Sequence, residues 1–290
     1  MNANRGHKAS LFVTLFNTPE ALRELYNALA GTNYGEETPV EINTLQDVLY
    51  QGIKNDLSFV IDGKLVVLVE HQSTPNPNMP LRFLLYMAEL YGRMIDNKEF
   101  HLRTRRKLPR PEFVVLYNGM IPMPDRWILR LSDAYEEYLG EPWGRLELEV
   151  PVVNINPGHN EELLRKSPLL GGYGKFIEKV REQKGLGKSL EDSILNALDY
   201  CIEAGILREF FKIRRMEVKK MILNELTNEY ALAAAREETW DAAWGAAWGA
   251  AWDAAYQEKL ESARGLKAMG VPLEAIALNL KLPRELVEGL

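Results

Sequence analysis

The chain has 290 residues, of which 46% are hydrophobic and 26% charged, the composition of an ordinary globular protein. Its formal net charge of −6 excludes a protein that attracts nucleic acid through an overall positive field, so any DNA contact must come from a local basic patch. The single cysteine, Cys201, excludes an internal disulfide and cysteine-rich metal motifs. No apolar run reaches the ~18 residues of a membrane span, and the run 11–16 is too short for a signal peptide. We therefore expect a cytoplasmic protein without a membrane partner.

The first half of the chain alternates between helical and strand patterns. Thr18-Pro19-Glu20 predicts the start of a helix that ends at Gly31, and a second helical pattern covers 79–95. Strands are predicted at 47–50, 56–61, 65–72, 113–117 and 146–155. The order helix, three strands, helix, strand is typical of an α/β core with a mixed sheet. Asn156-Pro157-Gly158 breaks the pattern, so we predict a core at 1–158 and a mostly helical region at 159–290.

The helical region contains a repeat in which tryptophan recurs every fourth residue between Trp240 and Trp252, with Tyr256 after it. A helix turns once every 3.6 residues, so this aromatic stripe drifts by roughly 40° per repeat. One interpretation of 240–256 is a surface through which the chain forms a homo-oligomer. The other is an exposed, duplicated helical spacer. A short helical tail follows, at about 270–290.

Two acids and an amide lie at one end of the predicted hairpin 56–72. A two-residue turn at Asp62-Gly63 would place Asp56 and Glu70 on opposite faces, whereas a three-residue loop 61–63 with Gly63 left-handed places Asp56, Glu70 and Gln72 on one face. The three-residue loop also places only apolar side chains on the other face of the hairpin, so we predict this loop. Metal-assisted phosphodiester cleavage needs such clustered oxygen ligands. The alternative is a turn aspartate beside a solvated strand end.

Three segments, Lys54–Phe59, Leu68–Thr74 and Asn76–Arg82, resemble in order and strand context the Rpn family of recombination-promoting, transposase-like nucleases in the PD-(D/E)XK superfamily. The resemblance covers roughly residues 10 to 160. It implies a restriction-endonuclease-like core and a DNA endonuclease dependent on Mg²⁺ or Mn²⁺, with Asp56 and Glu70 as metal ligands and DNA as partner. Gln72 stands where the superfamily pattern has lysine. Glutamine can hydrogen-bond but adds no positive charge, which leaves open a catalytically inactive protein that binds DNA or protein.

Further residues complete the hypothesis. Other superfamily members add an acid from the first helix, for which Glu24 is our first candidate and Glu20 the second; a solvated helix surface is the alternative. Arg82 is expected to meet a phosphate or a neighbouring acid. A basic segment is expected to bind DNA phosphates or to form a solvated loop; it consists of Arg103, Arg105, Arg106 and Lys107. The glycine-rich run 171–175 lacks the spacing of a phosphate-binding loop, so no nucleotide cofactor is predicted.

Overall fold

The structure is a computed structural model that describes residues 10–43, 56–96, 101, 103–136, 146–236, 260–280 and 284–289. The chain divides into two compact units, Met1–Glu229 and Tyr230–Leu290. The division lies well beyond the sequence break at 158, because the helices that follow the break pack in the same unit as the sheet. None of the described helices combines the length and the apolar character needed to cross a bilayer.

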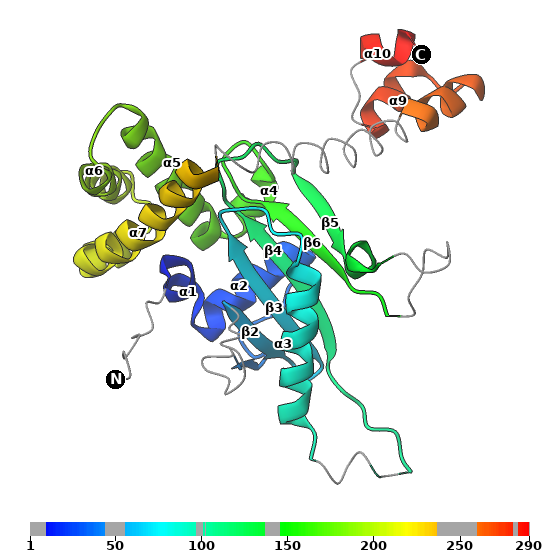
Figure 1. Ribbon diagram of the computed structural model, residues 1–290, viewed down its shortest axis with the longest axis horizontal. Coiled ribbons are helices and arrows are strands. Elements are labelled where there is room, and N and C mark those ends of the chain that lie inside the picture. The colour runs from blue at the N-terminus through cyan, green and yellow to red at the C-terminus, as the bar shows by residue number, and fades with distance from the viewer. Residues whose placement is uncertain are drawn as a thin grey trace. The chain divides into compact units, whose positions relative to one another are not determined.

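The first unit is an α/β fold around one mixed sheet of six strands in the order β1-β2-β3-β4-β6-β5 (Figure 1). Strands β3, β4 and β6 run parallel, and β1, β2 and β5 each pair antiparallel with their neighbours. The strands are β1 (Val40–Ile42), β2 (Leu57–Ile61), β3 (Leu65–Gln72), β4 (Arg110–Tyr117), β5 (Arg126–Arg130) and β6 (Glu149–Asn154).

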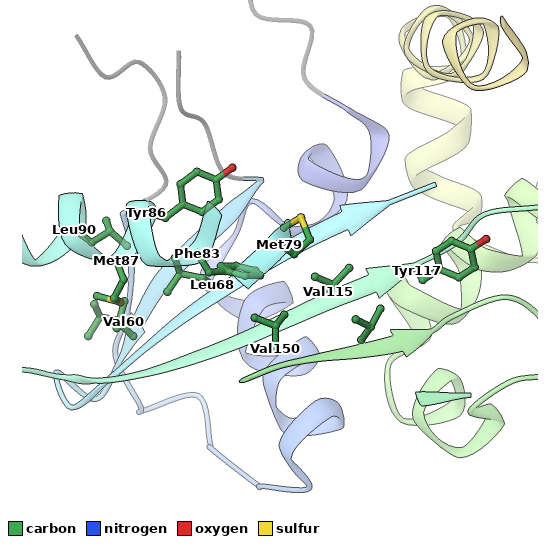
Figure 2. Packing of buried hydrophobic residues seen from close by; sticks show 12 residues of the cluster. Val60, Leu68, Met79, Phe83, Tyr86, Met87, Leu90, Val115, Tyr117 and Val150 are labelled. Atoms are coloured by element: carbon green, nitrogen blue, oxygen red, sulfur yellow. The ribbon is translucent and has the colours of Figure 1, made fainter. Parts of the chain in front are cut away.

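Helices cover both faces of this sheet. On one face, Phe83, Tyr86 and Met87 of α3 pack on Val60 and Val115, among others (Figure 2). Helices α1 and α2 lie on the other face (Figure 1). The helices of this unit are α1 (Leu11–Phe16), α2 (Pro19–Ala30), α3 (Met79–Met94), η2 (Leu131–Ala134), α4 (Glu161–Lys166), α5 (Pro168–Gly185), α6 (Leu190–Glu203) and most of α7 (Arg208–Arg236).

Local chemistry sets the ends of these helices. The Thr18 side chain accepts a hydrogen bond from the Ala21 N–H at the start of α2, and Gly31 ends that helix with a φ of 67°. Ser167 caps α5 in the same way by accepting from the Leu170 N–H. The predicted bounds of the helix after Thr18 and of the helix 79–95 are confirmed to within one residue.

The β2–β3 hairpin has the odd loop that the apolar pattern predicts, moved along by one residue. Ile61 pairs with Leu65, so the loop is Asp62-Gly63-Lys64 rather than 61–63. Gly63 has a φ of 62° as predicted, and Asp62 is left-handed as well, at 53°. The correction brings Asp56 opposite Glu70 instead of opposite Leu68, because Leu57 pairs with Val69.

The remaining predicted elements are confirmed only in part. The strands predicted at 113–117 and 146–155 are present as β4 and β6. Strands β1 and β5 and helix α1 were not predicted. The strand expected at 47–50 and the tryptophan repeat at 240–256 lie outside the described residues. In the second unit, α9 (Leu273–Leu280) and α10 (Arg284–Gly289) form the short helical tail around Ile276 and Val287.

Candidate metal site

The candidate site lies where the start of β2 meets the end of β3. Asp56 occupies the bend immediately before β2, and its backbone N–H donates to Glu70 Oε1 at 3.2 Å. The backbone N–H of His71 in turn donates to Asp56 Oδ2 at 2.8 Å. These two hydrogen bonds fix both carboxylates at the same end of the sheet, as the hairpin pattern predicts.

Glu70 is the centre of this cluster. It is 1% exposed, and its Oε2 accepts hydrogen bonds from Gln72 Nε2 at 3.3 Å and from Arg82 Nη2 at 3.2 Å. Arg82 is held in place by Tyr86, whose hydroxyl oxygen accepts from Nη2 at 2.6 Å and from Nε at 3.0 Å. Of its two expected roles, Arg82 therefore takes that of pairing with an acid. Its side chain remains 37% exposed.

Within the described part of the chain, the two acids of the site have little positive charge near them. Burial and the nearby charge of Asp56 raise the pKa of Glu70 to about 8, although Arg82 and the hydrogen bonds from Asp56 and Gln72 act in the opposite direction. Burial also raises the pKa of Asp56. Among the described residues one arginine, Arg82, acts on these two acids, so the pair keeps a proton at neutral pH or attracts a second cation.

The donor set fits a hard divalent cation. Mg²⁺ is commonly bound by one or two carboxylates and keeps several waters, so the number of carboxylates here agrees with such a site. Within the part of the chain that the structure describes, no three acidic, histidine or cysteine side chains form a metal-binding group. A fully protein-ligated zinc site is therefore not formed by those residues, whereas a sparse magnesium or manganese site is compatible with them.

His71 points away from the two acids, as strand alternation predicts. Its ring stacks on Phe12 with the centroids 4.9 Å apart, and its Nε2 lies 3.2 Å from the hydroxyl oxygen of Tyr173. Burial, with a contribution from the charge of Arg181, lowers the pKa of His71 to about 3, so the ring is neutral. It anchors the end of β3 to α1 and α5.

Sequence reasoning missed the polar groups that α5 and α7 bring to this end of the sheet. Arg181 of α5 donates to the backbone carbonyl of Asn118 at 2.7 Å, next to the end of β4, and to Glu229 Oε1 at 2.9 Å. The Tyr173 hydroxyl donates to Glu225 Oε1 at 3.4 Å. No signal in the sequence marked these residues, because charged residues on a helix usually read as solvated surface.

Glu24 and the basic segment do not join the site. Glu24 Oε1 accepts from Ser167 Oγ at 2.7 Å and from the Leu169 N–H at 3.2 Å, so this carboxylate caps the N-terminus of α5. Glu20, the second candidate for that role, is exposed on the surface of α2.

The basic segment precedes Arg110, which pairs with Leu65 at the start of β3, whereas Glu70 pairs with Val115. It therefore lies toward the opposite end of β3, where five residues at about 3.3 Å each separate Leu65 from Glu70 by roughly 17 Å.

Comparisons with protein-family models, with curated proteins and with solved structures found no match to this chain. The function must accordingly be argued from the geometry of the site.

Proposed function

We propose that this chain is a metal-dependent DNA endonuclease with a restriction-endonuclease-like core, acting in recombination or on mobile elements. The observation that carries the proposal is the pair Asp56 and Glu70, which face each other from adjacent antiparallel strands with Gln72 and Arg82 around them. A buried and a half-buried carboxylate at a sheet end, beside an amide and a half-exposed arginine, support phosphodiester hydrolysis assisted by one divalent cation. The sequence resemblance supports the same reaction.

Each residue has a definite task in this reaction. Asp56 and Glu70 would hold Mg²⁺ or Mn²⁺, which when bound polarises the scissile phosphate and lowers the pKa of water. Gln72 hydrogen-bonds to Glu70 and so fixes the orientation of that carboxylate. Arg82 is partly exposed, and its guanidinium would bind an oxygen of the phosphate. The basic segment, toward the opposite end of β3, would bind DNA at a distance from the cut.

A second candidate function is DNA binding without cleavage. It is favoured by the ion pair between Arg82 and Glu70, which already neutralises one of the two acids, and by glutamine at the position of the superfamily's lysine. In this case the fold and the basic segment would bind DNA, and no divalent cation would be needed.

Plasmid nicking with purified protein separates the two candidates. We expect Mg²⁺-dependent nicking by the wild type and its loss in Asp56→Asn and Glu70→Gln. Asp62→Asn is the matched control, because Asp62 is an exposed acid of the same hairpin that pairs with Lys64. Equal background nicking by the wild type and both site variants, together with a retained gel shift of DNA, would refute catalysis and support DNA binding alone.

A further inference from the structure

A loop with two exposed apolar side chains follows β4. It covers 118–125 and contains Met120, which is 43% exposed, and Ile121, which is 46% exposed. Met123 of the same loop instead packs against the cluster of buried residues beneath α3. The core therefore holds the loop through Met123 and leaves Met120 and Ile121 at the surface.

The strand register places this loop close to the candidate metal site. Tyr117, the last residue of β4, lies opposite Gln72 in the parallel pair, two residues beyond Glu70. Neighbouring strands are about 4.8 Å apart and successive residues about 3.3 Å, so Tyr117 lies roughly 8 Å from Glu70. Paired residues share a face of the sheet, so Tyr117 lies on the face that carries the site. Figure 2 shows it beyond Val115 at the end of β4.

Hydrogen bonds fix the backbone of the loop on that face. The Tyr117 hydroxyl donates to the backbone carbonyl of Ile121 at 2.7 Å. Asn156 Nδ2 donates to the backbone carbonyl of Gly119 at 3.1 Å. Both carbonyls flank Met120, so the two exposed side chains project from a backbone that is held on either side.

The loop is also joined directly to the end of β3. The backbone N–H of Asn118 donates to the backbone carbonyl of Gln72 at 2.9 Å. A side chain at Gly119 would collide with the backbone carbonyl of Ser73, so glycine permits the two segments to approach this closely. The loop therefore continues the surface of the candidate site, and a molecule bound there would meet Met120 and Ile121.

Stacked bases are a suitable partner for apolar side chains in this position. Proteins that kink DNA insert such side chains, methionine and isoleucine among them, between successive bases and thereby unstack one step. Base pairs follow one another at about 3.4 Å, so a separation of roughly 8 Å corresponds to about two to three base steps. A phosphate bound beside Asp56 and Glu70 would thus bring the neighbouring bases to the loop.

We infer that Met120 and Ile121 form a wedge that enters the base stack of DNA next to the scissile phosphate. The preferred substrate is therefore duplex DNA that is already unstacked there, as at a mismatch or a short single-stranded gap, because unstacking an intact step costs free energy. This inference rests on the proposed function, of which it needs DNA at the site but not its cleavage.

DNA affinity in EDTA, which prevents metal-dependent cleavage, tests the wedge by fluorescence anisotropy. We expect the wild type to bind a mismatched and a gapped duplex about 10-fold or more tightly than the intact duplex of the same sequence. The double variant Met120→Ser and Ile121→Ser should bind all three within about twofold of one another, because nothing then enters the stack. Ile213→Ser with Met216→Ser removes the same two residue types from exposed positions of α7 and should keep the preference.

Two measurements on the wild type cover the case in which the variant does not fold. A fluorescent adenine analogue, 2-aminopurine, brightens when it is unstacked, so it should brighten at one or two positions of the intact duplex when the protein binds. Peroxide should oxidise Met120 several-fold more slowly when DNA is bound, whereas Met216 should react at the same rate with and without DNA. Equal oxidation of Met120 in both states would overturn the inference.

The remaining outcomes separate this inference from the nuclease proposal. Equal affinity of the wild type for the three duplexes, without brightening, would overturn the wedge and leave the nuclease proposal to the nicking assay. A preference for mismatched and gapped DNA without Mg²⁺-dependent nicking would support the wedge and contradict catalysis. A smaller sedimenting mass of the DNA-free double variant would assign Met120 and Ile121 to a contact between copies of the chain, which also overturns the inference.

Discussion

Replacing Arg82 with methionine removes the one cationic group that contacts Glu70 among the residues that the structure describes, and it keeps an unbranched apolar stem. Breaking a fully buried ion pair costs about 3 to 5 kcal/mol and breaking an exposed one about 0 to 1 kcal/mol. Glu70 is buried and Arg82 is 37% exposed, so we expect the metal-free protein to lose about 1 to 3 kcal/mol. For a unit of this size the loss lowers the melting temperature by roughly 2 to 4 °C per kcal/mol.

A bound divalent cation replaces the lost charge, so the deficit should shrink when MgCl₂ is present. By linkage, the variant must then bind the cation more tightly than the wild type by the recovered free energy, which is about 5- to 150-fold if the whole deficit is recovered. The assays are thermal unfolding in EDTA and in MgCl₂, and calorimetric titration with MgCl₂. Arg93→Met, which breaks the exposed pair with Glu89 on the same helix, is the control and should cost less than 1 kcal/mol in both buffers. An Arg82→Met deficit that is equal in EDTA and MgCl₂, with unchanged cation affinity, would refute the reasoning.

Three more predictions concern other residues of the first unit. The buried His71 has its pKa lowered to about 3 by burial and then by the charge of Arg181, so its neutral form contributes stability above pH ~6.5 that is lost as pH falls toward 3. Urea titrations should therefore show that the free energy of unfolding of His71→Gln falls less steeply than that of the wild type over this pH range. The difference should reach up to about 1.4 kcal/mol per pH unit, and parallel curves for the two proteins would contradict this. Glu24→Ala should cost about 1 kcal/mol, through lost capping of α5, and leave nicking unchanged, whereas a loss of nicking at unchanged stability would restore Glu24 as an auxiliary acid. Neutralising the four charges of the basic segment should reduce the salt slope of DNA binding by up to about 3 to 4 without changing Mg²⁺ affinity, and an unchanged slope would exclude the segment from the DNA contact.

The β2–β3 hairpin shows which structural features the sequence predicts and which it does not. The alternation of apolar residues in β2 and β3 identified the face shared by Asp56 and Glu70, because an odd and an even loop differ in which residues are buried. It could not distinguish two odd loops, since a change of register by two residues leaves every side chain on its face. The choice of loop depends on Asp62, which adopts a left-handed conformation that aspartate tolerates. The apolar alternation therefore predicts which side chains share a face of the hairpin, but not which residue lies opposite Asp56.

The features that the sequence did not predict are short strands and contacts between residues far apart in the chain. Strand β1 has three residues, and β5 is a five-residue edge strand that begins and ends with an exposed arginine, so neither gives a clear alternating pattern. The contacts that bring Tyr173 and Glu225 to the end of β3 span 102 and 52 residues. Periodicity reports the face of a helix that is buried, but not the strand on which it packs.

The bonds of Arg181 to Asn118 and Glu229 have a consequence for synthesis of the protein. Glu229 leaves the ribosome roughly 5 to 20 seconds after Asn118, because synthesis proceeds at about 5 to 20 residues per second. Until then the parallel strands lack part of their cover and the pair of Asp56 and Glu70 lacks the helices behind it. The nascent chain therefore passes through a period in which its hydrophobic strands need protection from aggregation, until the first unit is nearly complete.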